Sequence, residues 1–403
     1  MISHFYTASM NIKTFGTAGR YIQGPGVLQL VGEIVRSYNI KKPIVFAGRR
    51  AMDTIERHGL FDSLNQSGAI FTREVFGAGS CGPEACDEEI QRLSEIGRAD
   101  GCDAVIAAGG GKAIDTGKAV ADNLNVPIIV IPTIASTDAP CSAIAIIYTC
   151  DHVFKGVRFC PRNPDAVLVD TKIIAEAPPM FLACGIGDAM GKYTEVPAAL
   201  RAGAKNRLVK PVHGYPTLLA AAAQKLMVDT LFTYAEEAIE SVELGVVTPA
   251  LEAVVEAVTL LSQVAFEAGG LSAAHSIYGG FTVLETDPRY KNSFPCHGGL
   301  VFFGALVEMV MDGYPRDEIV RVMEFGHRVG LPINLEELGF RDIADDELKK
   351  VAEAATKPGR TIHNRVYRVT PETVLSAIKV ANEIGLTVAE KIPRREFRRK
   401  STV

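Results

Sequence analysis

Three consecutive glycines and a lysine, Gly109-Gly110-Gly111-Lys112, stand between an apolar run and a helix-like segment. Residues 104–108 are all apolar and predict a buried strand, and the chain from Lys112 onward has the apolar spacing of a helix. Consecutive glycines let the backbone approach a ligand closely, and a helix start offers unpaired N–H groups to a phosphate. The run therefore predicts a phosphate-binding loop. Its spacing matches neither G-x-G-x-x-G nor G-x-x-x-x-G-K, so a glycine turn for tight strand–helix packing is the alternative.

A second loop with ligand-type side chains follows the next apolar run. Residues 126–132 predict another buried strand, and the segment directly after it holds Thr133, Ser136, Thr137 and Asp138, three hydroxyls and one carboxylate within six residues. Open α/β sheets bind ligands just past the carboxyl ends of their strands. Small polar residues also serve as turn formers. Two neighbouring strands that both end in such loops favour a dinucleotide site.

The elements that would position these loops follow a regular pattern. Up to about residue 176, short apolar strands alternate with amphipathic helices, which predicts a parallel sheet covered on both faces. The expected strands span 44–47, 70–76, 104–108, 126–132 and 166–169. From residue 178 onward, long alanine- and leucine-rich segments indicate helices. We therefore predict an α/β domain with a parallel Rossmann-like sheet at 1–177 and an all-α domain at 178–403.

The composition excludes several classes of partner. The net charge of −5 over 403 residues gives no general attraction to nucleic acid or to an anionic membrane. The most apolar long segment, 248–268, contains three glutamates at helical spacing and does not resemble a membrane span. Eight scattered cysteines without a C-x-x-C pair predict buried thiols rather than a disulfide framework. We expect a cytoplasmic protein without a nucleic-acid or membrane partner.

Six motifs together resemble the glycerol dehydrogenases, within the iron-containing alcohol dehydrogenase and dehydroquinate synthase superfamily. They are GGGKAIDTGKAVA, PTIASTDAPCSA, PRNPDAVLVDT, GIGDAM, GGLSAAHS and CHGGLVFFGAL, in matching order and approximate spacing. The resemblance runs from about Pro43 to beyond Asn364, and PTIASTDAPCSA is specific to the glycerol dehydrogenase branch. It implies a dehydroquinate synthase-like architecture and a homo-oligomer.

The resemblance also assigns roles to residues that the sequence alone leaves open. Taken alone, Asp188, His275 and His297 are compatible with hydrogen-bonded polar residues of a core; the resemblance implies that they bind a divalent metal, usually Zn²⁺, with Fe²⁺ as the alternative. Asp138 and His275 would contact the substrate. The positions that match cofactor contacts are Gly110, Gly111, Lys112, Asp115, Thr133, Ser136, Ser142, Ile144 and Tyr148.

The implied activity is hydride transfer between a small polyol, such as glycerol or a similar vicinal diol, and NAD⁺ or NADP⁺. A divalent cation on the hydroxyl oxygen favours the alkoxide from which hydride leaves readily. The alternatives are a glycerol-1-phosphate dehydrogenase, another alcohol dehydrogenase, or a dehydroquinate synthase-like lyase. The last requires many lysines and arginines for its substrate, and residues 185–297 offer few.

Four departures from the family concern cofactor and substrate. After the first strand, NAD-using members carry an acidic residue, whereas this chain has Gly48-Arg49-Arg50. Either Arg49 or Arg50 binds a 2′-phosphate, which favours NADP⁺, or both arginines are solvated at a helix start. Tyr278 replaces a common histidine, Gly299 replaces a common glutamate, and 285–295 resembles an insertion. These last three differences leave the exact alcohol open.

Overall fold

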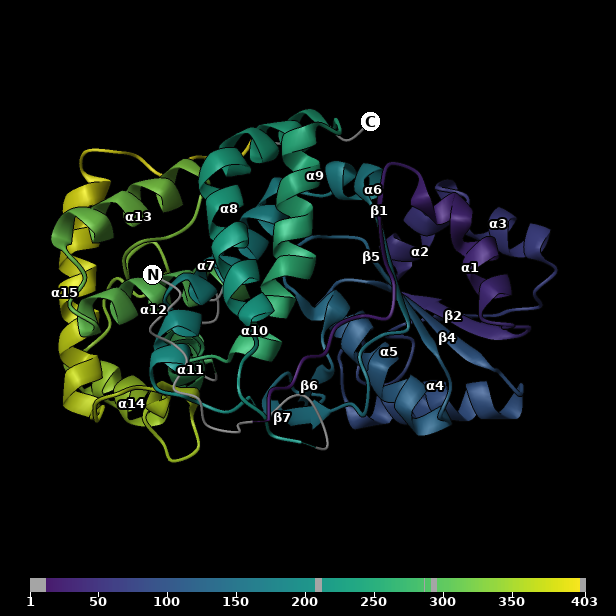
Figure 1. The fold of residues 1–403 in the computed structure, drawn as a ribbon, viewed down its shortest axis with the longest axis horizontal. Coiled ribbons are helices and arrows are strands. Elements are labelled where there is room, and N and C mark those ends of the chain that lie inside the picture. Colours follow the sequence, from purple (N-terminus) through teal and green to yellow (C-terminus); the bar gives the residue numbers. More distant parts are fainter. Residues whose placement is uncertain (1–11, 207–211, 286, 291–295, 399–403) are drawn as a thin grey trace.

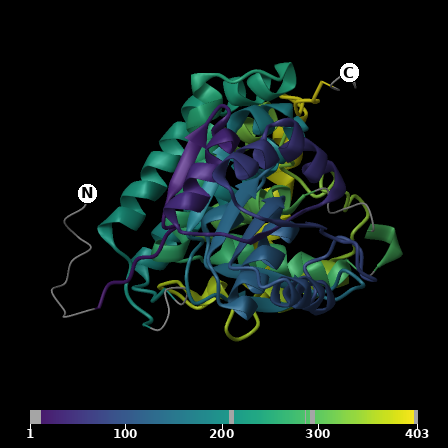
Figure 2. The same cartoon turned by 90° about the vertical axis from the view of Figure 1, so that its right-hand side faces the viewer.

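A computed structural model describes residues 12–206, 212–285, 287–290 and 296–398 of the chain. The strands of its main sheet lie between residues 21 and 170, and the described elements from Pro179 onward are helices (Figure 1). Figure 2 views the molecule from the α/β half, with the helical half behind it. The predicted fold, a parallel sheet domain followed by a helical domain, is confirmed.

Six parallel strands form the main sheet, in the order β1-β8-β5-β4-β2-β3. Their bounds are β1 Tyr21–Gly24, β2 Pro43–Ala47, β3 Thr72–Val75, β4 Ala104–Gly109, β5 Ile128–Pro132 and β8 Ala166–Asp170. The covering helices are α1 Val31–Ser37, α2 Arg49–Arg57, α3 Leu60–Ser67, α4 Asp87–Ala99, α5 Gly111–Leu124 and α6 Thr171–Glu176. All residues of β2, β4, β5 and β8 are buried, which explains their continuous apolar runs.

The register of β4 and β5 brings the two predicted ligand loops together. Gly109, at the end of β4, pairs with Pro132, at the end of β5. The N–H of Thr133 then donates to the carbonyl oxygen of Gly109 over 3.0 Å. Gly109 has a φ of +146°, a conformation that favours glycine. The glycine run and the hydroxyl-rich loop therefore lie side by side at one edge of the sheet.

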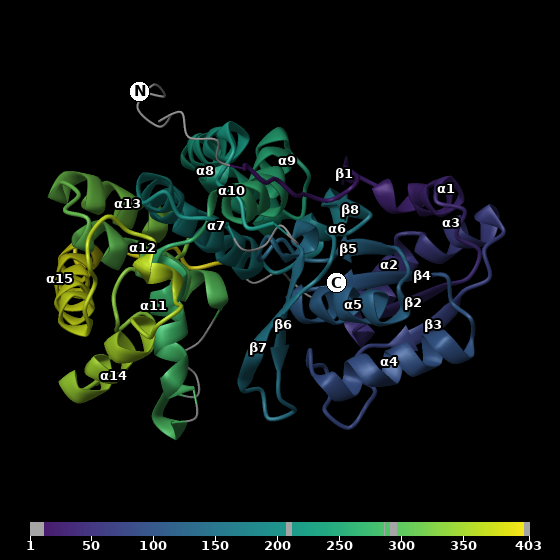
Figure 3. The same ribbon diagram turned by 60° about the horizontal axis from the view of Figure 1, so that its bottom comes forward.

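A two-stranded antiparallel hairpin, β6 Ile144–Tyr148 and β7 Phe154–Phe159, was not expected from the sequence. It projects beside the sheet toward the helical half (Figure 3). Asp115 on α5 accepts a hydrogen bond from the N–H of Ile146 over 2.9 Å. Four of the six residues of β7 are exposed, so this strand lacks the buried apolar run by which the central strands are recognised.

The helical half is built around one long helix, α7 Pro179–Arg201, which packs against α8, α10, α11 and α12. The helices that follow it are α8 Leu218–Leu244, α9 Pro249–Glu256, α10 Ser262–Gly269, α11 Ala273–Phe281, α12 His297–Met311, α13 Arg316–Arg328, α14 Asp345–Ala355 and α15 Pro371–Ala389. A Cβ on Gly298 would lie 1.7 Å from the carbonyl oxygen of Cys184, and one on Gly187 would lie 2.4 Å from that of Gly298. Only glycines allow the backbones of α7 and α12 this close approach.

The first described residues cross to the helical half before the sheet begins. The N–H of Tyr215 donates to the carbonyl oxygen of Ile12 over 2.8 Å, and the hydroxyl of Thr17 donates to Gln263 over 2.8 Å. The predicted domain boundary at 177 and 178 falls between α6 and α7. This boundary stays a prediction, and the strand-free segment before β1 ties the two parts together.

Two structural details bear on the expectations from composition. Residues 249–269 are long and apolar enough to span a membrane, but 67% of the apolar window is buried inside the protein, where α9, a π-helical turn and α10 form part of the core.

The expectation of free thiols is wrong for four cysteines, which form the disulfides Cys81–Cys150 and Cys184–Cys296. Each pair is far apart in sequence and meets only through the tertiary structure. Cys86, Cys102, Cys141 and Cys160 are buried free thiols.

Replacement of Gly117 by alanine should destabilise the α/β half. Gly117 lies on α5 where it crosses β4, and a Cβ there would meet the Cβ of Ala107 at 2.3 Å. Overpacking of this kind costs about 1–3 kcal/mol, which exceeds the gain in helix propensity. We expect Gly117→Ala to lower the apparent Tm by several degrees. Gly156→Ala is the matched control, since nothing lies within 4 Å of a Cβ there. An unchanged Tm for Gly117→Ala would contradict the tight packing of α5 on the sheet.

Candidate metal centre and cofactor cleft

Three helices bring Asp188, His275 and His297 together around one point. Asp188 lies in the middle of α7, His275 in the first turn of α11, and His297 is the first residue of α12. Oδ1 of Asp188 lies 3.2 Å from Nε2 of His275 and 3.5 Å from Nε2 of His297. The side chain of Asp188 is 3% exposed, whereas that of His297 is 34% exposed and reaches the surface of a pocket. The three residues predicted to bind metal therefore converge.

The geometry and the chemistry of this cluster fit a divalent cation. One donor atom from each residue lies within 4.8 Å of the other two. A tetrahedron with metal–ligand distances of about 2.1 Å has edges of about 3.4 Å, close to the separations around Asp188. Two imidazoles and one carboxylate suit zinc or iron(II), and three protein ligands leave a position for a substrate oxygen.

Buried charges around the cluster support the same assignment. Asp188, Lys192 and Glu195 follow one another at i, i+4 and i+7 on one face of α7, and all three are buried. Nζ of Lys192 lies 2.7 Å from Oδ1 of Asp188 and 3.1 Å from Oδ2 of Asp138. As metal ligands, the imidazoles of His275 and His297 must be neutral. The carboxylates of Asp138, Asp188 and Glu195 then face a single ammonium, that of Lys192. The two uncompensated negative charges match a divalent cation.

The protonation equilibria of these groups follow from their neighbours. Burial tends to raise the pKa of Asp188, but the Lys192 ammonium and the two imidazoles lower it well below its usual value. Burial tends to lower the pKa of Lys192, but Asp138 and Asp188 raise it above its usual value. Burial also disfavours protonation of His275, but the carboxylates of Glu195 and Asp188 raise its pKa to about 9. The site therefore attracts positive charge strongly.

Asp138 joins this cluster from the loop after β5. It precedes the short 3₁₀ helix Ala139–Cys141, and its Oδ2 accepts a hydrogen bond from the hydroxyl of Ser262 over 2.7 Å. The same oxygen lies 3.1 Å from Nζ of Lys192, which also binds Asp188. Asp138, predicted to contact substrate, is therefore held next to a predicted metal ligand by a shared buried ammonium.

A pocket of about 200 Å³ opens beside His297. Its lining residues are Lys112, Tyr148, His152, Tyr278, Glu285, Cys296, His297 and Leu300. The ring of Tyr278 packs edge-on against that of His297, with centroids 4.4 Å apart, and burial raises the pKa of Tyr278 to about 12. Two of the departures noted in the sequence, Tyr278 and Glu285, thus line the pocket. Gly299 instead lies against Pro332, and residues 291–295 fall outside the described part of the chain.

The predicted cofactor positions divide into two groups. Gly110, Gly111, Lys112, Thr133, Ser136, Ile144 and Tyr148 are at least partly exposed around the two loops and β6. Asp115 and Ser142 are instead buried, and Nζ of Lys118 donates to both over 3.1 Å. Burial raises the pKa of Asp115 even though Lys118 opposes the shift. Asp115 binds the N–H of Ile146 in β6, and Ser142 lies just before that strand, so the buried cluster holds α5 to β6 and to the segment that precedes it.

Sequence reasoning missed four residues of this region. Lys192 and Glu195 escaped notice because nothing local shows which groups they meet, although their helical spacing from Asp188 in an apolar segment was a usable signal. Glu84 and His152 were also missed. The buried carboxylate of Glu84 lies 2.6 Å from Nζ of Lys112 and 2.5 Å from Nδ1 of His152, so it ties the glycine loop to the hairpin turn.

The chain is similar to known proteins over most of its length. Residues 18–171 match the model of the iron-containing alcohol dehydrogenase family. The chain is 41% identical over 367 residues to a glycerol dehydrogenase of Thermotoga maritima, covering 91% of this chain and 96% of the relative. It is 35% identical over 377 residues to a glycolaldehyde reductase of Halobacterium salinarum, covering 94% and 99%. The crystal structure of glycerol dehydrogenase from Schizosaccharomyces pombe matches with a TM-score of 0.88 at 33% identity, covering 97% and 96%.

Loss of one imidazole should abolish tight metal binding. We expect the parent protein to bind about one zinc ion per chain, and His297→Ala to weaken the affinity by more than about a hundredfold, since a lost ligand costs more than a lost outer partner. Competition with a chromophoric chelator measures the number of zinc ions bound per chain and the zinc affinity. His363→Ala is the control, because His363 is exposed and its Nε2 bonds the carbonyl oxygen of Thr356 at 3.0 Å. Equal zinc affinity in His297→Ala and the parent would remove His297 from the site.

Proposed function

This chain belongs to the iron-containing alcohol dehydrogenase family, and we propose that it oxidises a small polyol, glycerol or a similar vicinal diol, with NAD(P)⁺. The family inferred from the sequence motifs is confirmed, and the chain is a metal-dependent oxidoreductase. The glycerol dehydrogenases among its relatives support a polyol as the substrate. The product would be the corresponding ketone, and the same site would catalyse the reverse reduction.

One observation carries this proposal more than any other. Lys192 binds Asp138 and Asp188 at once, so the residue proposed to hold a substrate hydroxyl lies next to a proposed metal ligand. The pocket beside His297 is also lined by Lys112, which follows the glycine run proposed to bind the cofactor phosphates. Substrate, metal and cofactor contacts would therefore meet at one opening. This is the arrangement that direct hydride transfer between two bound molecules needs.

The residues have distinct parts in the proposed reaction. Asp188, His275 and His297 would hold the metal, which when bound acts as a Lewis acid that makes the alcohol proton easier to lose, while NAD(P)⁺ accepts the hydride. Asp138 would accept a hydrogen bond from a second hydroxyl of the polyol and so orient the carbon that loses hydride. Lys192 keeps the Asp138 carboxylate in place. Because the side chain of Asp188 is buried, the surrounding protein limits the access of water to this ligand.

The identity of the metal follows from the donor set. We propose Zn²⁺, because two imidazoles and one carboxylate with an open fourth position are a common catalytic zinc set. Fe²⁺ is the alternative, since nitrogen and oxygen ligands with open positions also suit non-haem iron. The assignment of Gly110, Gly111, Lys112, Thr133, Ser136, Ile144 and Tyr148 to the cofactor is likewise part of this proposal. Asp115 and Ser142, which are buried, would support the cofactor loops from the interior of the protein.

The phosphorylated substrates of the alternatives fit the pocket less well. A glycerol-1-phosphate dehydrogenase or a dehydroquinate synthase-like lyase needs several cations around its substrate. Among the described residues that line the pocket there is one lysine, Lys112, and no arginine. The ammonium of Lys112 already faces Glu84. A neutral polyol needs no such cations.

A small hydroxyaldehyde is a second candidate substrate. The relative from Halobacterium salinarum, which is similar over nearly the whole chain, is named a glycolaldehyde reductase. A hydroxyaldehyde offers the same two adjacent oxygens as a vicinal diol, so Asp138 and the metal ligands would serve it equally. Rates with glycerol, 1,2-propanediol, dihydroxyacetone and glycolaldehyde distinguish the two candidates.

We also propose that the enzyme is a cytoplasmic homo-oligomer. Helix α8 has four leucines that are more than half exposed: Leu218 at 56%, Leu219 at 52%, Leu226 at 56% and Leu244 at 66%. Apolar side chains gathered along one helix are typical of a protein interface. The proposed metal ligands, Asp138 and the proposed cofactor loops all come from one chain.

Removal of the Asp138 charge should impair polyol turnover more than cofactor binding. Asp138→Asn keeps the side-chain size, but loses an ionic hydrogen bond of about 1.5–3 kcal/mol, so kcat/KM for glycerol should fall about tenfold to hundredfold. The Kd for the cofactor, measured in protein loaded with one zinc ion per chain, should stay close to that of the parent. Ser262→Ala is the control, because it removes a partner of Asp138 and keeps the charge. Equal losses in turnover and cofactor affinity would make the loop a cofactor support only.

The turn after β2 generates a prediction about cofactor choice. Gly48 caps α2 and a Cβ there meets nothing within 4 Å, while Arg49 is exposed and forms no ion pair with any described residue. We expect NADP⁺ to be accepted at least as well as NAD⁺. A variant with Gly48→Asp and Arg49→Ala should lower the NADP⁺/NAD⁺ ratio of kcat/KM about tenfold to hundredfold, because a carboxylate repels a 2′-phosphate. Arg57→Ala, at the far end of α2, is the control. A strong NAD⁺ preference that the variant leaves unaltered would refute the role of Arg49.

A further inference from the structure

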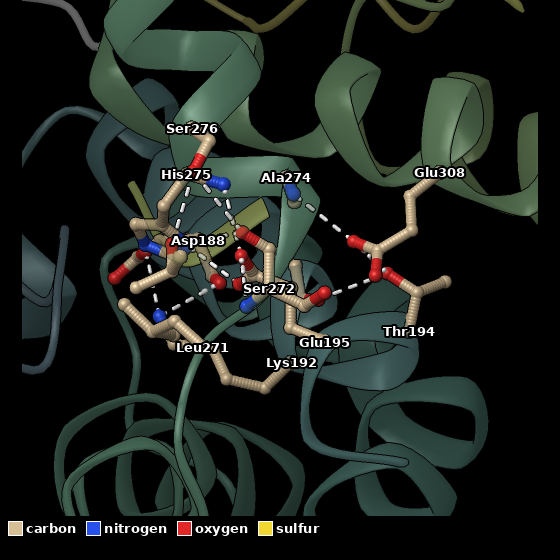
Figure 4. Close-up of polar contacts among 12 residues, drawn as sticks. Asp188, Lys192, Thr194, Glu195, Leu271, Ser272, Ala274, His275, Ser276 and Glu308 are labelled. Carbon is tan, nitrogen blue, oxygen red and sulfur yellow. Dashed lines mark hydrogen bonds and ion pairs between the residues drawn. The ribbon is translucent and has the colours of Figure 1, made fainter. Parts of the chain in front are cut away.

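The helix that carries His275 has no cap of its own. Ser272 stands at the N-cap position of α11, but its side chain accepts no capping hydrogen bond. The N–H groups of Ser272 and His275 instead donate to Oε1 of Glu195 over 3.1 and 3.0 Å, and that of Ala274 donates to Oε2 of Glu308 over 3.0 Å. Two buried carboxylates from α7 and α12 therefore cap α11 from outside (Figure 4). Unpaired N–H groups at a helix start attract such negative charge.

Glu195 makes one further contact that Glu308 does not make. Its second oxygen, Oε2, lies 2.6 Å from Nδ1 of His275, the same residue whose backbone N–H binds Oε1. Nε2 of the ring then points to Asp188, with Oδ1 of the latter 3.2 Å away. One carboxylate thus fixes both the backbone and the ring of His275.

We propose that Glu195 is a positioning residue of the metal centre, which holds His275 with Nδ1 protonated and Nε2 directed at the metal. The proposal rests on the metal site used in the proposed function. A carboxylate that accepts a hydrogen bond from the ring nitrogen that does not bind the metal fixes the tautomer and the orientation of a histidine ligand. It also makes the metal-binding nitrogen a better electron donor. Because Asp188 and Glu195 lie on one face of α7, that helix supplies both a ligand and the support of a second ligand.

The surroundings of Glu195 require a carboxylate rather than an amide. Its oxygens face three donors: two backbone N–H groups and the ring Nδ1. A glutamine has one acceptor oxygen; with that oxygen on the two backbone N–H groups, its NH₂ group faces Nδ1 of His275 and forces the ring proton onto Nε2, the atom that would bind the metal. The side chain of Glu195 is fully buried, and no solvent is at hand to relieve this conflict.

Glu308 offers a matched control for the capping role. It is equally buried and caps the same helix through Ala274, but it binds Thr194 and Arg365 rather than an imidazole. Glu308→Gln therefore disturbs the start of α11 without touching the ring of His275. The two variants separate general support of the helix from orientation of the ligand.

The test compares zinc affinity in metal-free protein reloaded with Zn²⁺ alone, by competition with a chromophoric chelator. We expect Glu195→Gln to weaken the affinity about tenfold to hundredfold, and Glu308→Gln to change it less than about threefold. The visible spectrum of the Co²⁺-loaded protein should change in Glu195→Gln only. Both variants should lower the Tm of the metal-free protein, since each weakens the contacts at the start of α11 and Glu308→Gln also weakens the buried ion pair with Arg365.

Two results would overturn the proposal: parent-like zinc affinity in Glu195→Gln, or equal weakening in both variants. If Glu195→Gln does not fold, Glu195→Asp takes its place, because it keeps the charge but withdraws it from the ring. It should then weaken zinc binding, and parent-like affinity in this variant would equally overturn the proposal. Neither measurement depends on turnover, so a failure of the proposed polyol activity would be seen separately in the parent enzyme.

Discussion

The close approach of α7 and α12 is the constraint on which the site depends. Gly187 and Gly298 let the two backbones come together where a single Cβ would collide with a carbonyl oxygen. Asp188 and His297 directly follow and precede these glycines, so the same contact sets the distance between two proposed ligands. The disulfide Cys184–Cys296 joins the two helices at this point. A backbone contact that leaves no space fixes the geometry more firmly than flexible side chains could.

The electrostatics of the centre follow from what this packing buries. Asp138, Asp188 and Glu195 are removed from water with Lys192 as their common buried cation. Buried charges are costly unless they are paired, and one ammonium cannot neutralise three carboxylates. His275 responds by holding a proton more strongly than usual, with its pKa raised to about 9. A divalent cation on Asp188, His275 and His297 would supply the missing charge, so metal affinity and the stability of the fold are coupled.

The cofactor side is organised by the sheet rather than by charge. The register of β4 and β5 aligns the glycine loop with the hydroxyl-rich loop, and Tyr148 and His152 of the β6–β7 hairpin line the pocket together with Lys112. Glu84 joins Lys112 to His152 across this opening. The edge of the sheet and the packed helices thus meet at the pocket. Asp138, in the loop after β5, contacts Lys192 and Ser262 of the helical half. The site proposed for catalysis therefore takes residues from both halves of the chain.

The sequence by itself determined the features that depend on local pattern: the buried strands, the two loops that follow β4 and β5, and the change to helices near residue 178. Motif resemblance further identified Asp188, His275 and His297, which the structure brings together. Only the tertiary structure decided the hairpin, the two disulfides, the burial of Asp115 and Ser142, and the contacts of Lys192 and Glu195. The physical reason is range. Periodicity and turn chemistry act over a few residues, whereas the hydrogen bond between Glu195 and His275 spans 80 residues and exists only once α7 and α11 pack.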